Sequence, residues 1–131
     1  GYFVSASDGN FFISGGSAWD GSSWVAKASS AYEFGGGIAG VRFFHDTGLT
    51  PGNLFAPTPR LVVASSGNVG IGTTGPTDLL DVNSNAIRVR TSKTPASASD
   101  TGNQGEICWD SDYVYVCVAA NTWKRAALSS W

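Results

Sequence analysis

Glycine-containing turns recur at short intervals along the chain, and this spacing restricts the fold more than any other feature. The 131 residues include 17 glycines, and no segment keeps an apolar spacing of 3.6 residues for three helical turns. Glycine disfavours helix interiors. Aromatic residues, which make up 12% of the chain, favour strands. The sequence therefore predicts an all-β fold of short strands joined by tight turns.

The first half of the chain contains several expected strands. The expected strands are residues 2–4, 31–34, 38–44 and 61–63. The run Gly35-Gly36-Gly37 is expected to interrupt the strand pattern. The pair Asp20-Gly21 lies between Trp19 and Trp24, which is typical of a hairpin with an aromatic cross-strand pair. Residues 46–59 contain three prolines and are expected to form a long loop.

A turn followed by apolar alternation occurs twice in the sequence. Residues 6–13, with the turn signal Asp8-Gly9-Asn10, and residues 64–71 share this pattern. It indicates one structural device used twice, or a chance similarity of turn chemistry. Ile87 and Val89 alternate with arginines, which predicts a half-buried strand with a cationic outer face.

The last segment contains the clearest hairpin. Residues 106–109 and 113–118 form its two arms, and Asp110-Ser111-Asp112 supplies the turn. Residues 91–104, rich in Ser, Thr and Ala, are expected to be a linker or surface loop. We therefore divide the chain into residues 1–84 and 85–131.

Charge and composition argue against several classes of partner. The net charge is −2 and no basic patch is visible, which argues against a nucleic-acid partner. The apolar runs are too short to cross a bilayer, so no membrane insertion is expected. The chain has one histidine, His45, which we expect at the surface, and two cysteines, so no metal or cofactor site is predicted.

No catalytic constellation stands out. Asp110 and Asp112 fall in a predicted turn, where Asp caps its own backbone. Asp78 and Asp81 flank two leucines, and Gly70-Ile71-Gly72 lacks the lysine of a phosphate-binding loop. We therefore predict no catalytic residue and a chain that is not an enzyme.

Three stretches carry a family resemblance. The segment 66–76, Ser-Gly-Asn-Val-Gly-Ile-Gly-Thr-Thr-Gly-Pro, and the following Leu80-Asp81-Val82 closely resemble a segment of the tail-fibre and tailspike proteins of tailed phages. Residues 32–44 leading into 61–65 resemble the strands that precede that segment. Residues 105–125, with Gly-Glu-Ile-Cys-Trp-Asp and Asn-Thr-Trp-Lys-Arg, are similar to a terminal module of such proteins.

The resemblance implies an elongated homotrimer of intertwined strands on the phage virion. Residues 1–84, with the loop 46–59, would form a shaft-like β region, and residues 85–131 a C-terminal tip module. Methionine is absent even at position 1, so we expect a piece of a longer chain whose N-terminal part joins other tail proteins. Assembly in a reducing cytosol would keep Cys108 and Cys117 as free thiols.

The expected function is structural and adhesive, with attachment to a bacterial surface glycan or lipopolysaccharide. Aromatic side chains stack on sugars, and cations contact acidic groups, so the C-terminal module supplies the candidate receptor-binding residues Trp109, Tyr113, Tyr115, Trp123, Lys124 and Arg125. The competing interpretation places these aromatics in a core or a trimer interface. The alternative functions are a monomeric lectin-like module and a fragment of a polysaccharide-degrading tailspike.

Overall fold

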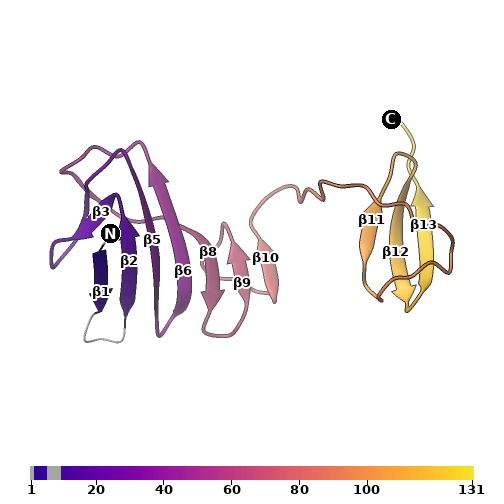
Figure 1. Ribbon diagram of the computed structural model, residues 1–131, viewed down its shortest axis with the longest axis horizontal. Helices are drawn as coiled ribbons and strands as arrows, with labels where there is room; N and C mark the ends of the chain where they lie inside the picture. Colours follow the sequence, from indigo (N-terminus) through magenta and orange to yellow (C-terminus); the bar gives the residue numbers. More distant parts are fainter. Residues whose placement is uncertain (1, 6–9) are drawn as a thin grey trace. The chain divides into compact units, whose positions relative to one another are not determined.

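The computed structural model describes residues 2–5 and 10–131, and all regular structure in these residues is β-strand (Figure 1). The predicted all-β class is therefore confirmed. The chain divides into two compact units, Gly1–Asn85 and Ala86–Trp131. The predicted turn at residues 8–10 and the first copy of the repeated pattern fall largely outside the described residues.

The N-terminal unit is built on a sheet of seven strands. Neighbouring strands are antiparallel except β9 and β10, which run parallel. In sheet order the strands are β1 (Tyr2–Ser5), β2 (Phe11–Gly15), β5 (Ser30–Gly37), β6 (Gly40–Thr47), β8 (Pro59–Ala64), β9 (Val69–Ile71) and β10 (Leu80–Val82).

A second, three-stranded sheet packs on one face of the large one. It consists of β3 (Ser17–Trp19), β4 (Trp24–Ala26) and β7 (Leu54–Phe55). Trp19 and Trp24 are register partners with ring centroids 5.7 Å apart, which confirms the predicted aromatic hairpin. The Trp24 ring also meets Phe12 of the large sheet at 5.5 Å, so the two sheets share a core.

The glycine run at 35–37 was expected to interrupt a strand, and this prediction is wrong. All three glycines lie in β5, and the chain turns only at residues 38–39. The reason is packing from a neighbouring strand: a side chain at Gly35 would collide with the ring of Phe12 on β2. Glycine at position 35 therefore leaves room for the Phe12 ring to lie against the backbone of β5 where β2 and β5 pair.

The segment 46–59 is only partly the predicted loop. Asp46 and Thr47 belong to β6, Pro59 begins β8, and Leu54–Phe55 form β7. The short strand β7 forms because the backbone edge of β4 is free to pair with it, through Trp24 and Val25. His45 is exposed, as predicted.

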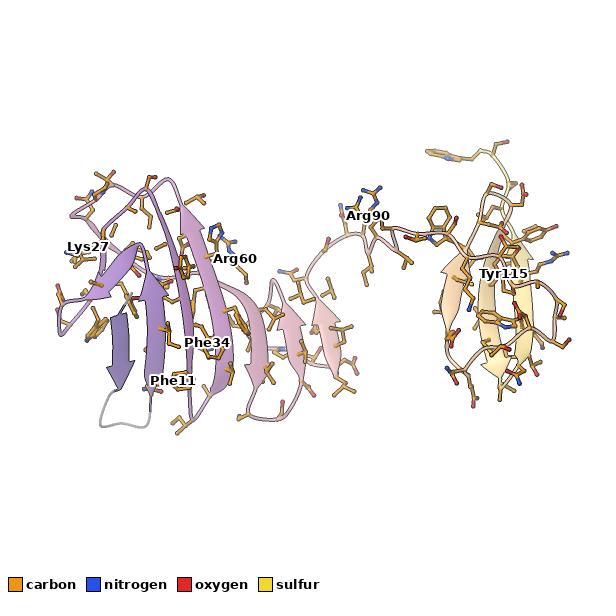
Figure 2. The ribbon with its side chains drawn as sticks, in the orientation of Figure 1. Phe11, Lys27, Phe34, Arg60, Arg90 and Tyr115 are labelled. Atoms are coloured by element: carbon orange, nitrogen blue, oxygen red, sulfur yellow. The ribbon has the colours of Figure 1, made fainter. Side chains whose placement is uncertain are left out.

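The other face of the large sheet is apolar and open. Phe34 lies between Phe11, 5.6 Å away, and Phe43, 4.8 Å away, and Phe11 and Phe34 are labelled in Figure 2. Large apolar side chains with 43–64% of their surface exposed continue this face across the sheet: Ile13, Tyr32, Phe43, Ile71 and Leu80. We refer to this surface as the apolar face.

The C-terminal unit is an antiparallel sheet of β11 (Ile107–Trp109), β12 (Tyr113–Ala119) and β13 (Thr122–Ala127). The predicted hairpin with its turn at 110–112 is confirmed. One face of the sheet carries the buried cluster of Cys108, Tyr115, Cys117 and Trp123. Both cysteines are free thiols in this cluster.

The predicted strand at Ile87 and Val89 is not formed. Both side chains are exposed, and residues 86–90 have no strand geometry. Alternation alone does not make a strand, because a strand also needs a backbone edge to pair with. One contact of this segment is made instead with a side chain, since the Trp109 indole N–H donates to the Val89 carbonyl at 2.8 Å.

Candidate functional site

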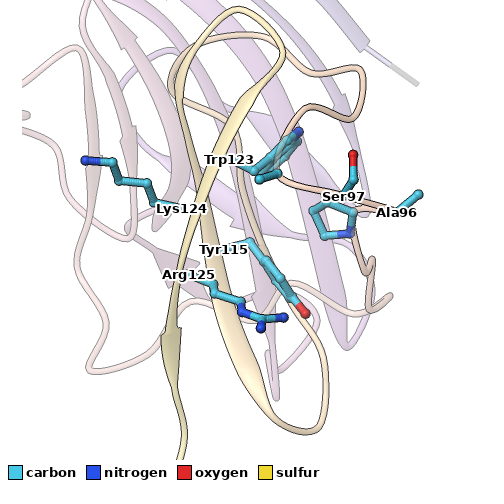
Figure 3. Close-up of a pocket in the computed structure, with 8 residues that line it drawn as sticks. Ala96, Ser97, Tyr115, Trp123, Lys124 and Arg125 are labelled. Atoms are coloured by element: carbon cyan, nitrogen blue, oxygen red, sulfur yellow. The ribbon is translucent and has the colours of Figure 1, made fainter.

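A pocket of about 290 Å³ opens on the C-terminal unit between a loop and two strands (Figure 3). Residues 95–98 form one wall, and β12 and β13 form the other. Four of the six predicted receptor-binding residues line it, namely Tyr115, Trp123, Lys124 and Arg125. The segment predicted as a linker thus folds over the sheet, since the Trp123 backbone N–H donates to the Ala98 carbonyl at 2.9 Å.

Tyr115 and Trp123 form the floor of this pocket. They are only 4% and 6% exposed. The Trp123 indole N–H donates to the Asp100 carbonyl at 3.0 Å, and Gly102 packs directly against its ring. The ammonium of Lys93 lies 4.8 Å from the centre of the same ring. Both aromatic rings are therefore fixed in place, and neither offers a broad face to a ligand.

Arg125 is the cationic side chain that turns toward the pocket. Its guanidinium carbon lies 4.0 Å from the centre of the Tyr113 ring, a cation–π arrangement. Arg125 is exposed, and among the described residues no carboxylate lies within ion-pair distance of it. Figure 3 shows this guanidinium close to the Tyr115 hydroxyl, whereas Lys124 points away from the pocket. Besides its interaction with the Tyr115 hydroxyl, the stacked guanidinium keeps N–H groups in its own plane that can meet an anion.

Asp110 organises the turn beneath this pocket. Its Oδ2 accepts the Tyr115 hydroxyl at 2.6 Å and the Thr94 hydroxyl at 2.8 Å. Its Oδ1 accepts the backbone N–H groups of Asp112 and Tyr113 at 2.9 and 2.8 Å. The Tyr115 hydroxyl first, and then the backbone N–H of Asp112, hold the pKa of Asp110 far below its ordinary value. The same bond raises the pKa of Tyr115. Asp110 is therefore a fully used acceptor within the turn.

Trp109 lies on the opposite face of the sheet from Tyr115. There it lines a shallow apolar groove of about 390 Å³ together with Ile87, Val89, Ile107 and Val114. The register places Lys124 beside Val116 on the same face. The six predicted residues are thus divided between two faces, which the hairpin pattern could have indicated from the parity of their positions.

Two polar groups in the N-terminal unit could not be predicted as site candidates from the sequence. Glu33 is 2% exposed, and Ser17 donates a hydrogen bond to its Oε1 at 2.5 Å, while Oε2 has no hydrogen-bond partner. Burial raises the pKa of Glu33. The Nε of Arg42 is also buried and has no hydrogen-bond partner. Both residues lie within apolar strands, where side-chain partners depend on the tertiary fold.

Neither a metal-binding cluster nor a membrane-spanning helix is found in the described part of the chain. No group of three His, Cys, Asp or Glu residues there could hold a metal ion. Residues 2–5 and 10–131 also contain no helix with the length and apolar character needed to span a bilayer.

Part of this chain is similar in sequence to two phage enzymes. It is 60% identical over 42 residues to Depolymerase 1, capsule K30/K69-specific, of Klebsiella phage K5-2, a match covering 32% of this chain and 5% of that protein. It is 39% identical over 56 residues to a capsule K30/K69-specific depolymerase of Klebsiella phage K64-1, covering 43% of this chain and 7% of that protein. No family model and no solved structure matches the chain.

These matches support a region of a phage tail-associated protein and correct one prediction. The prediction that the chain is not an enzyme is contradicted, because both proteins that it matches over part of its length are depolymerases, which are enzymes. That expectation rested on the lack of a recognisable catalytic pattern. Such a pattern depends on carboxylates brought together by the fold, so its absence from the linear sequence was weak ground for excluding an enzyme.

Proposed function

We propose that this chain is part of a phage tail depolymerase that attacks a bacterial capsular polysaccharide. The observation that carries the proposal is the pair of matches at 60% and 39% identity to capsule-specific depolymerases. The matched regions cover 5% and 7% of those proteins. The activity, the substrate and the place on the virion tail therefore all belong to the proposal.

Within such an enzyme, the C-terminal unit would hold the capsule through the pocket that Arg125 enters. An exposed guanidinium that is stacked on Tyr113 and has no carboxylate partner among the described residues is suited to the acidic groups of a polysaccharide. Tyr115 and Trp123 would shape the pocket from below, while Trp109, on the opposite face, would offer an indole edge to a second sugar. Five of the six predicted residues keep a role in this proposal, with Arg125 as the principal contact, whereas Lys124 points away from the pocket.

The proposal also includes assembly as a homotrimer, because the apolar face of the N-terminal unit needs a cover. Monomeric proteins seldom leave large apolar patches open, and the large side chains on this face are roughly half exposed. Three copies around an axis would bury these faces against one another. An elongated, intertwined arrangement of this kind remains part of the proposal.

The activity is tested with the protein that carries this chain in the phage. We expect it to release reducing ends from capsular polysaccharide of types K30 and K69, the types in the relatives' names. A heat-denatured sample serves as the blank. Absence of release from both polymers would overturn the proposed activity.

Capsule binding is tested with the 131-residue chain itself. Arg125→Gln is expected to weaken binding roughly fivefold, because a modest single contact is amplified when several copies bind together. Lys27→Gln, at another exposed cation in the N-terminal unit, is the matched control and should bind like the parent. Equal binding by all three proteins would rule out the Arg125 pocket as the capsule contact.

A further inference from the structure

A groove of about 260 Å³ lies in the N-terminal unit, at the hairpin that joins β5 and β6. Its wall combines two aromatic rings, one arginine and a stretch of backbone with almost no side chains. The lining residues are Asn10, Phe12, Gly35 to Gly40, Arg42 and Phe44. This groove is separate from the C-terminal pocket and is not used in the function proposed above.

The strand register sets which side of the sheet the groove faces. Phe12 pairs with Gly35, and Gly35 pairs with Arg42, so these three residues point to one side. Phe34 and Phe43 form the next pair and point to the other side. The groove therefore opens on the side opposite the apolar face, and covering that face leaves the groove free.

Glycines in the groove wall let two neighbouring side chains lie directly against the backbone of β5. A side chain at Gly35 would collide with the Phe12 ring, and one at Gly37 would collide with the side chain of Asn10. The rings of Phe12 and Phe44 lie 6.3 Å apart at a 50° tilt. The two tilted rings and the glycine backbone form an apolar surface, and aromatic faces of this kind pack against the C–H groups of sugars.

Arg42 supplies the polar group of the groove. Its Nε is buried and lacks a hydrogen-bond partner, which is costly for a charged donor. Arg60 on the adjacent strand shows the usual arrangement, since its Nε–H donates to the His45 carbonyl at 2.8 Å and its Nη2 lies 4.0 Å from Asp46. Among the described residues no carboxylate is within ion-pair distance of Arg42. An acceptor brought by a ligand would satisfy it.

We propose that this groove binds a sugar unit that bears a carboxylate, as in a uronic acid. The carboxylate accepts the Nε–H of Arg42 together with a neighbouring guanidinium N–H, the side-on bidentate geometry that arginine favours with carboxylates. The C–H face of the sugar packs on Phe12 and Phe44. The carboxylate follows from Arg42 alone, whereas the choice of a sugar as its carrier rests on the proposed function.

The test uses nitrogen-15-labelled protein and two small probes, methyl β-glucuronide and methyl β-glucoside, which differ only in the carboxylate. The glucuronide should shift the Arg42 Nε–H signal and the amides of Gly35 to Gly37, with affinity at least about tenfold above that of the glucoside. Sodium acetate at the same concentration reports whether a carboxylate suffices without the sugar. Equal binding of the two glycosides, or binding of neither, would overturn the proposal.

Variants locate the effect. Arg42→Gln should abolish the glucuronide-induced shifts at Gly35 to Gly37, whereas Arg60→Gln and Arg125→Gln should leave them intact. Shifts confined to residues 95–98 and 115–125 would place acidic-sugar binding in the C-terminal pocket and refute this site. Reducing-end release from capsule is measured separately, so loss of the groove site and loss of the proposed activity are distinguishable.

Discussion

At the scale of single residues, Glu33 is a carboxyl that the fold holds in an unfavourable place. It lies between sheets with one oxygen bonded to Ser17 and the other without a hydrogen-bond partner. Desolvation raises its pKa in the folded state. The neutral form is therefore the one that folding favours. Its stabilising effect is complete below the ordinary carboxyl pKa and is lost as the pH rises through the raised folded value.

The expected result is a melting temperature of the N-terminal unit that falls as the pH rises above the ordinary carboxyl pKa in the parent chain. Glu33→Gln should remove most of this fall and raise stability at pH 8 by on the order of 1 kcal/mol, about 4–8 °C in Tm. Asp78→Asn removes the same charge from an exposed site and should change nothing. Thermal melts followed by circular dichroism as a function of pH decide the matter; parallel profiles for parent and Glu33→Gln would contradict the assignment.

Asp110 behaves in the opposite sense. Its lowered pKa means that its stabilising effect is present in full above the ordinary carboxyl pKa and is lost only as the pH falls through the lowered value. Asp110→Ala removes four accepted hydrogen bonds and should lower the melting temperature of the C-terminal unit by several degrees at neutral pH. Asp112→Ala, two positions on, is the control, since among the described residues the carboxylate of Asp112 accepts only the Ser111 hydroxyl, at 3.3 Å. Equal melting temperatures for the two variants would mean that the Asp110 network does not stabilise the turn.

At the scale of strands, the sequence predicted best where the information is local. The hairpins at Trp19/Trp24 and at 106–118 combine a turn and paired residues within a few positions, so their pattern was sufficient. The run at Gly35 was misinterpreted because its cause, the Phe12 ring, comes from another strand. The alternation at 87–89 failed for a related reason, since it found no strand partner. Likewise, Arg42 became a site candidate only when the register placed it beside Phe12 and Phe44.

The role of Gly35 can be tested directly. Gly35→Ala should destabilise the N-terminal unit by about 1–3 kcal/mol, because the added methyl group forces the Phe12 ring or the β2–β5 pairing to move. Gly75→Ala is the matched control, since a side chain there meets nothing within 4 Å, and its effect should stay within about 0.5 kcal/mol. Urea unfolding curves give both values. A Gly35→Ala variant as stable as Gly75→Ala would show that the run is not needed for packing.

At the scale of the whole molecule, the apolar face is a surface that a single chain leaves exposed to solvent. Phe43 and Ile71 lie on it with 46% and 43% of their surface exposed. Burying such side chains gains roughly 25 cal/mol per Å² of apolar surface, and closing strands against other copies also protects sheet edges from aggregation. The same gain at exposed apolar side chains on β2, β5, β6, β9 and β10 makes a stable oligomer the expected state.

Light scattering of the 131-residue chain should therefore give about three times the 13.6 kDa mass of one chain. Phe43→Lys places three charges at the proposed junction of three copies and should shift the mass to that of a single chain at micromolar concentration. Ser65→Lys adds the same charge at an exposed turn and should remain trimeric. A parent chain that is already monomeric would support a lectin-like module that binds glycan alone, and a parent dimer would exclude closure around a threefold axis. If Phe43→Lys stays trimeric while the parent is also trimeric, the copies meet through another surface, and the apolar groove beside Trp109 in the C-terminal unit becomes the next surface to test.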